Sequence, residues 1–255
     1  MVRLPPSRPR GRFLRRLLAW AGGALALLLA ALVGVGWLTG AADAASQNAL
    51  AHDALPFYGD ASLRPRWDTW ASWQRTAAFA LDSQHDRPVT EQDMAGHATV
   101  LGFFYAGCVT TCPVSTQLLR LLDTQLHGEG GPAAAAPPRF VLLSLTPELD
   151  RPRDLAGYAE RLQLPAGWTL LTGTPAGMGR LTASLWTDTS LRLPGGEPLH
   201  AERVFLLDGK RRIRGIYTAA STVEMRRLAN DYRRLLAEQQ AGTTVAAVAT
   251  EQSAH

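Results

Sequence analysis

Cysteine and lysine are both scarce in this chain of 255 residues. There are only two cysteines, Cys108 and Cys112, so any intramolecular disulfide would be one bridge between near neighbours. Lys210 is the one lysine, so every other basic residue is an arginine apart from the histidines, a bias that suggests a GC-rich genome. No internal repeat is visible.

Acidic residues are missing from the first sixteen positions. These positions carry six positive charges, more than the net charge of +4 of the whole chain, so the remainder is acidic by two charges: the arginines are Arg3, Arg8, Arg10, Arg12, Arg15 and Arg16. The basic isoelectric point of about 9.5 is therefore a property of this arm. Nucleic-acid binding by the rest of the chain is not supported.

Charged residues are also absent from Leu17 to Leu38. As a helix, this stretch would be about 33 Å long, which is enough to cross the hydrocarbon core of a bilayer. We predict a basic cytoplasmic arm at 1–16 and a transmembrane anchor at 17–38 in a bacterial inner membrane, with the rest of the chain on the periplasmic side. The alternative is a signal peptide cleaved near Ala42-Asp43-Ala44, but signal peptides have shorter apolar cores, of about 7–15 residues.

Both cysteines lie where a predicted strand gives way to a predicted helix. Ala98–Tyr105 is apolar and aromatic, which indicates a buried strand. Pro113 suits the first turn of a helix over 113–127, and an apolar stripe follows it at helical spacing. Unpaired amide hydrogens at the helix entrance favour negative charge, so thiolate is expected there.

The spacing of the cysteines allows either metal binding or disulfide formation. Residues i and i+4 share a helix face with Cβ atoms about 5–6 Å apart, and such a pair also suits a disulfide. A bridge that closes so short a loop stabilises a fold little. We therefore favour metal or redox chemistry over a purely structural bridge.

The remaining pattern predicts an α/β fold. Residues 39–76 form a linker and a tryptophan-rich segment that we expect to pack on the globular body, with a partner or membrane-surface contact as the alternative. The domain at 77–239 starts with a hairpin around Ser83–Asp86, and its strands then alternate with helices up to a last hairpin at Asp208-Gly209 and a final helix. This order is the thioredoxin arrangement, and we expect a disordered tail at 240–255.

His200 is the candidate for a third metal ligand. It lies just ahead of the predicted strand Val204–Leu207, whose start is expected beside the cysteine turn. The other five histidines fall in the linker, on turns, at element ends or in the tail. Two thiolates and an imidazole form a compact soft site, because thiolate ligands select Cu(I), zinc or iron–sulfur clusters. Spacing alone leaves this assignment open.

Several motifs together resemble the SCO/SenC family over about residues 77–238. They are Phe-Tyr-x-x-Cys-x3-Cys-Pro at 104–113, Ser144-Leu145-Thr146-Pro147-Glu148-Leu149-Asp150, Leu171-Thr172-Gly173, and Leu199-His200 before Val204-Phe205-Leu206-Leu207-Asp208. The resemblance implies a thioredoxin-like copper protein that helps assemble the binuclear copper centre of cytochrome c oxidase. It implies Cys108, Cys112 and His200 as copper ligands, the copper-centre subunit of the oxidase as partner, and a copper donor protein.

The sequence departs from the family pattern near the site. Val109 and Thr110 stand where many members have Pro and Asp, and Thr146 replaces the usual Asp before Pro147. Negative charge is lost at these positions, so copper affinity and redox potential are expected to differ. The alternative function is an extracytoplasmic thiol–disulfide oxidoreductase that uses Cys108 and Cys112 as a redox pair, although its usual motif has two intervening residues. A peroxidase-like thiol enzyme has no further support.

Overall fold

The computed structural model describes residues 54–67, 75–128, 138–190, 192, 194, 196 and 202–252, with side chains up to 241. The chain forms two compact units, 1–53 and 54–255, and the described residues belong to the second. The predicted anchor at 17–38 and His200 lie outside the described residues. Within the described ranges, no helix has both the length and the apolar character needed to cross a bilayer.

In the described part of the chain, seven strands form a mixed sheet in the order β2-β1-β5-β4-β3-β6-β7. The central strands β3 (Thr99–Phe104), β4 (Arg139–Ser144) and β5 (Thr169–Thr172) are parallel. The outer strands are antiparallel to their neighbours: β1 (Ala80–Ser83), β2 (Pro88–Thr90), β6 (Arg203–Leu207) and β7 (Ile213–Thr218).

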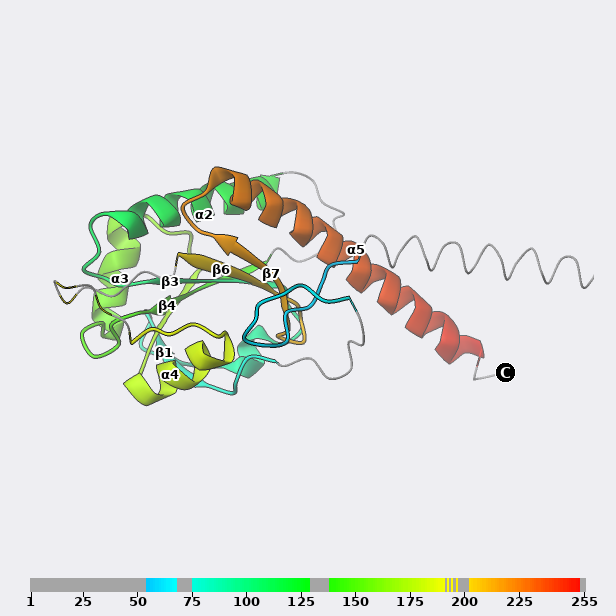
Figure 1. The fold of residues 1–255 in the computed structure, drawn as a ribbon, viewed down its shortest axis with the longest axis horizontal. Helices are drawn as coiled ribbons and strands as arrows, with labels where there is room; N and C mark the ends of the chain where they lie inside the picture. The colour runs from blue at the N-terminus through cyan, green and yellow to red at the C-terminus, as the bar shows by residue number, and fades with distance from the viewer. Residues whose placement is uncertain are drawn as a thin grey trace, which may run out of the picture. The chain divides into compact units, whose positions relative to one another are not determined.

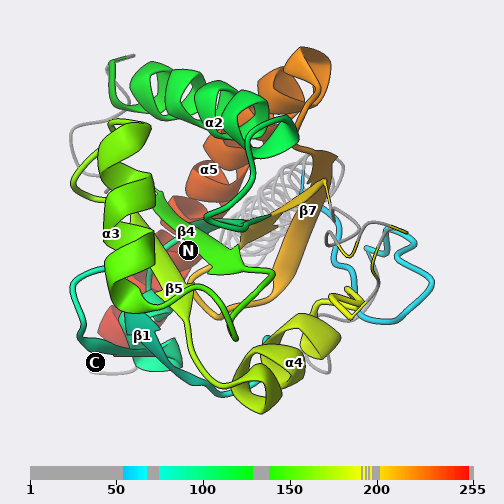
Figure 2. The ribbon, with the colours of Figure 1, turned by 90° about the vertical axis from the view of Figure 1, so that its left-hand side faces the viewer.

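Helices cover both faces of this sheet. Helices α2 (Thr111–Gly128), α3 (Pro152–Arg161) and α5 (Thr222–Gln252) lie on one face (Figure 1). Helix α4 (Pro175–Ser184) lies on the other face together with the short 3-10 helix η2 (Glu91–Met94) (Figure 2). Successive residues of β3 point into the two cores, Val100 into the α2 side and Leu101 into the α4 side. Such a strand is buried on both faces, which explains its uninterrupted apolar sequence.

The predicted α/β order and both hairpins are confirmed, but two details differ. Helix α5 continues to Gln252, so most of the tail expected to be disordered at 240–255 is helical. The second hairpin turns through residues 208–212, with Arg211 in the left-handed region at φ 63°. Gly209 instead allows a close approach, because a Cβ there would lie 2.9 Å from the backbone of Gly96. Gly96 is more than 100 residues away in the sequence, so the residues around Gly209 give no sign of this contact.

Residues 54–67, called the strap below, pack against β7 and α5. Arg214 of β7 is 4% exposed and lies over the Phe57 ring, 4.1 Å from its centroid. Its guanidinium donates to the carbonyls of Leu55 and Pro56 at 2.7 and 3.1 Å, and to the Glu238 carboxylate at 2.6 Å. The strap is thus held at the start of β7, which is the end of the sheet where β3 begins.

Candidate metal centre

The two cysteines follow the carboxyl end of β3. The chain leaves the strand at Phe104 and makes a turn in which the Cys108 N–H donates to the Tyr105 carbonyl at 3.1 Å, and then enters α2 at Thr111. Pro113 occupies the first turn of this helix, where its missing N–H removes no intrahelical bond. The strand–turn–helix order places both thiols at one edge of the sheet, as predicted.

No disulfide joins the two thiols, which are each 4% exposed and belong to the core cluster beneath α2. The Cys112 N–H donates to Cys108 Sγ at 3.2 Å, and the Thr111 hydroxyl lies 3.8 Å from the same sulfur. Cys108 therefore lies at the amino end of α2, where the helix dipole favours negative charge.

The two thiols differ in acidity. Burial alone would raise the pKa of Cys108, but hydrogen bonds from Cys112, Thr110 and Thr111 lower it to about 7. Burial raises the pKa of Cys112, and its hydrogen bond to Cys108 raises it further. The helix start therefore favours thiolate at one cysteine rather than at both.

The residue Ala106, two positions before Cys108, is held from two sides. Its N–H donates to the Asp150 carboxylate at 3.2 and 3.3 Å, and its carbonyl accepts from Arg161 Nη2 at 2.8 Å. We call these two side chains the Ala106 clamp. The sequence indicated Asp150 only as part of a family motif, and Arg161 gave no signal, because both contacts join segments more than 40 residues apart.

Three exposed apolar side chains lie on the two segments at the cysteine edge of the sheet. Val109, between the cysteines, is 85% exposed, and Val114 in the first turns of α2 is 54% exposed. Leu149, in the loop after β4, is 70% exposed. We call these three residues the apolar rim. They lie on the segments that follow the carboxyl ends of the neighbouring strands β3 and β4.

The structure brings two of the three predicted ligands together. Cys108 and Cys112 share one buried site, whereas His200 lies outside the described residues. Strand β6 begins at Arg203 antiparallel to β3, so it starts at the edge of the sheet where β3 ends. Among the described residues, no group of three or more His, Cys, Asp and Glu side chains is placed to hold a metal ion. Two sulfur donors, one of them with thiolate character, nevertheless fit a soft ion such as Cu(I).

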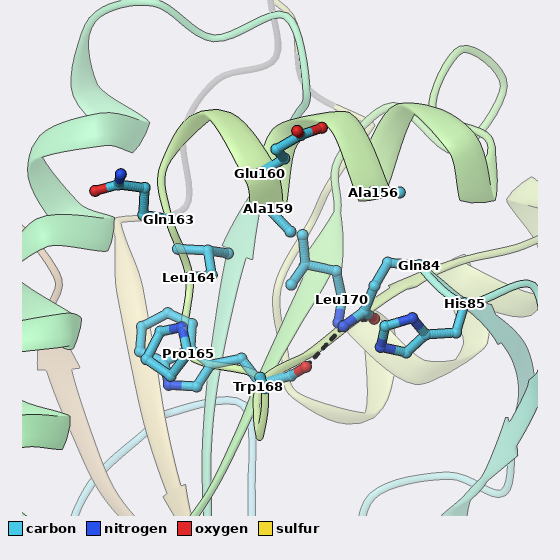
Figure 3. A pocket seen from close by; sticks show the side chains of 11 residues that line it. Gln84, His85, Ala156, Ala159, Glu160, Gln163, Leu164, Pro165, Trp168 and Leu170 are labelled. Atoms are coloured by element: carbon cyan, nitrogen blue, oxygen red, sulfur yellow. Dashed lines mark hydrogen bonds between the residues drawn. The ribbon is translucent and has the colours of Figure 1, made fainter.

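A separate cavity of about 320 Å³ lies away from the cysteines, between α3 and the β1–β2 turn (Figure 3). Ala159, Leu164 and Leu170 contribute its apolar lining. The Gln84 amide at its side donates to the Trp168 carbonyl and accepts from the Leu170 N–H. His85, Glu160 and Gln163 add polar side chains to the lining. None of the sequence motifs lies there, so the cysteine site is the stronger functional candidate.

Comparisons with known proteins identify the family and the fold. The family model described as SCO1/SenC matches residues 71–237. The fold is similar to that of a SCO1/SenC family lipoprotein from Bacillus anthracis str. Ames, with 22% identity, a TM-score of 0.56, and coverage of 64% of this chain and 95% of that one. No curated protein matches the sequence.

Two further solved structures share the fold at the same TM-score of 0.56 and the same 64% coverage of this chain. Arabidopsis thaliana ScoI with copper bound is 18% identical, and 98% of it is covered. BsSco, a member of the Sco family of cytochrome c oxidase assembly proteins with a disulfide switch, is 19% identical, and 93% of it is covered.

The matched range 71–237 contains every strand of the sheet, both cysteines and the Ala106 clamp. It spans well over half of the sequence, and the thioredoxin-like arrangement of the solved relatives recurs in it. This chain belongs to the SCO1/SenC family.

Proposed function

We propose that this protein is a membrane-anchored copper chaperone that delivers copper to the binuclear centre of cytochrome c oxidase. The observation that carries the proposal is the pair of buried thiols at the start of α2, which no disulfide joins and one of which has a pKa of about 7. Structures of relatives hold copper, and one relative belongs to the cytochrome c oxidase assembly proteins. Copper is here a cargo, so the site has to release it as well as bind it.

Cys108 and Cys112 would hold the ion through their sulfurs, with His200 as the third ligand. Thiolates suit Cu(I), whereas imidazole also suits Cu(II), so this set can serve both oxidation states. The register of β6 supports His200, because the strand that it precedes starts at the cysteine edge. The anchor at 17–38 would keep the domain beside its membrane-bound target, on the periplasmic side.

Thiol–disulfide exchange is the second candidate, and the unequal acidity of the two thiols favours it. The Cys108 thiolate would attack a disulfide of the target and release one target thiolate. Cys112, after losing its proton, would attack the Cys108 sulfur, release the second target thiol and leave a Cys108–Cys112 disulfide. Two electrons pass to the target, whose cysteines become free to bind copper.

A copper titration of the reduced full-length chain in detergent tests the proposal. The wild type is expected to bind one equivalent of Cu(I) in competition with a chelator, and Cys108→Ser to lose most of this affinity. Cys112→Ser should lose affinity as well if both sulfurs bind the ion. Unchanged binding in both variants would refute the copper site.

A further inference from the structure

Asp150 is a buried carboxylate among the neutral residues of the cysteine edge. It is 4% exposed, and no ion pair joins it to a basic side chain of the described residues. Its oxygens accept from Ser144 Oγ at 2.6 Å, Thr146 Oγ1 at 2.9 Å and the Ala106 N–H. Burying a charge without a counterion is costly unless several hydrogen bonds compensate for it, and here three groups do so.

These hydrogen bonds join three neighbouring segments of the sheet edge. Ser144 ends β4, Thr146 lies in the loop after it, and Ala106 belongs to the cysteine turn after β3. The main-chain carbonyl of Asp150 also accepts from the Thr172 hydroxyl at the end of β5. Asp150 thus fixes the cysteine turn relative to the ends of β4 and β5.

Arg161 binds Ala106 from the solvent side. Its side chain runs over the Tyr158 ring, 5.7 Å from the centroid, and donates to the Ala106 carbonyl. The peptide groups on both sides of Ala106 are therefore fixed. Only Gly107 separates Ala106 from Cys108, so a displacement of the turn moves the Cys108 sulfur relative to Cys112, which α2 holds.

We propose that Asp150 and Arg161 are positioning residues that set the separation of the Cys108 and Cys112 sulfurs through Ala106. No sulfur contact of either side chain is observed, so both act through the turn. Thr146 has a defined part in this clamp, because its hydroxyl supplies a neutral donor to the Asp150 carboxylate. The affinity of the thiol pair for a metal ion and its tendency to close a disulfide would both depend on the clamp.

Asp150→Asn tests the clamp, with Asp123→Asn as its matched control. Asp123 is equally buried and accepts from Trp168 Nε1 at 2.9 Å, but it lies eleven residues beyond Cys112, about 16 Å along α2. Full-length protein is equilibrated with glutathione buffers, and Cu(I) affinity is measured by chelator competition. Asp150→Asn is expected to lower the equilibrium constant for the Cys108–Cys112 disulfide and the Cu(I) affinity each by about tenfold, and Asp123→Asn to change neither.

Arg161→Ala keeps the test decisive if Asp150→Asn does not fold. Arg161 is at the surface, and Arg153→Ala on the same helix is its control, since the Arg153 side chain is 76% exposed. A several-fold fall in both constants for Arg161→Ala alone supports the clamp. The clamp is refuted if Asp150→Asn and Arg161→Ala each have the same disulfide constant and Cu(I) affinity as their control variants. If Asp150→Asn is unfolded, the comparison of Arg161→Ala with Arg153→Ala decides alone.

The copper measurement rests on the proposed function, whereas the disulfide measurement does not. A wild-type chain that binds no copper would refute the chaperone. Even then, a disulfide equilibrium constant that is lower in Asp150→Asn or Arg161→Ala than in the matched control would still support the clamp.

Discussion

The backbone N–H of Cys112 points at the sulfur of Cys108, at 3.2 Å. One cysteine thus supplies part of the environment that stabilises the thiolate of the other. Cys108 is therefore the more acidic and more reactive thiol, and Cys112 the less acidic one, although each is 4% exposed.

Alkylation of the single-cysteine variants should show this difference. The pKa of Cys108 is about 7, so its thiolate forms as the pH rises through 7. In Cys112→Ser the serine hydroxyl replaces the thiol as donor and the backbone N–H stays, so Cys108 should react with iodoacetamide at half its maximal rate near pH 7. The raised pKa of Cys112 means that Cys108→Ser should react only above pH 9. Mass spectrometry over pH 5–10 gives both profiles, and coincident midpoints would contradict the assignment.

His200→Ala should affect the two oxidation states of copper differently. Because imidazole is the ligand that serves Cu(II), Cu(II) binding is expected to fall by more than tenfold, and the dithiol–disulfide equilibrium to change less than twofold. Equilibrium titration and glutathione buffers measure the two quantities. His97→Ala, at the amino end of β3 and away from the cysteines, is the control. Full Cu(II) affinity in His200→Ala would remove His200 from the ligand set.

Val109→Glu should impair transfer to a partner without weakening copper binding. The side chain is 85% exposed beside a buried sulfur, so a target that reaches the thiols has to contact it. Burying the new carboxylate in that interface would be unfavourable. Leu121→Glu, on α2 and 56% exposed, is the control. The rate of copper transfer to the purified copper-centre domain of the oxidase should fall about tenfold only for Val109→Glu, and equal rates would exclude the apolar rim as the docking surface.

Arg214→Ala should destabilise the fold and release the strap. The substitution leaves the Asp208 and Glu238 carboxylates without this partner, and removing one member of a buried ion pair costs about 3–5 kcal/mol. Denaturant unfolding measures the loss, and limited proteolysis reports the strap. Arg226→Ala, exposed on α5, should change stability by no more than about 0.5 kcal/mol. An unfolding free energy as high as that of Arg226→Ala would mean that the network contributes little.

Gly209→Ala and Gly179→Ala should have opposite effects on stability. A Cβ at Gly209 would press on the backbone of Gly96, at a cost of about 1–3 kcal/mol. At Gly179, within α4, no atom lies within 4 Å of the added Cβ, so alanine should stabilise the helix by about 0.5–1 kcal/mol. Thermal unfolding of the two variants distinguishes them, and a rise in the Tm of Gly209→Ala would contradict the close approach.

The sequence predicted the features that depend on local patterns. The apolar run before Cys108 and the stripe after Pro113 placed the thiols at a strand–helix junction, because burial on both faces of a strand and on one face of a helix leaves different periods. The hairpins and the order of the central strands followed from the same reasoning.

The features that it missed depend on contacts between distant segments. Arg214 is a charged residue within an apolar strand. Its burial is explained by the Asp208 and Glu238 carboxylates and the strap carbonyls, and the strap is more than 150 residues away in the sequence. The Asp150 contact with Ala106 joins residues 44 positions apart. The unequal acidity of the cysteines depends on the start of α2 at Thr111, which directs the Cys112 N–H at the Cys108 sulfur, and helix boundaries are hard to predict to within one or two residues.

The strap is fastened at the end of the sheet where β3 begins, whereas the cysteines follow the end where β3 finishes. A six-residue strand, about 20 Å long, therefore separates the tether point from the reactive sulfurs. A protein that docks over the sulfurs would not compete with the strap for space. Under the proposed function, membrane attachment and copper delivery would therefore take place at opposite ends of the sheet.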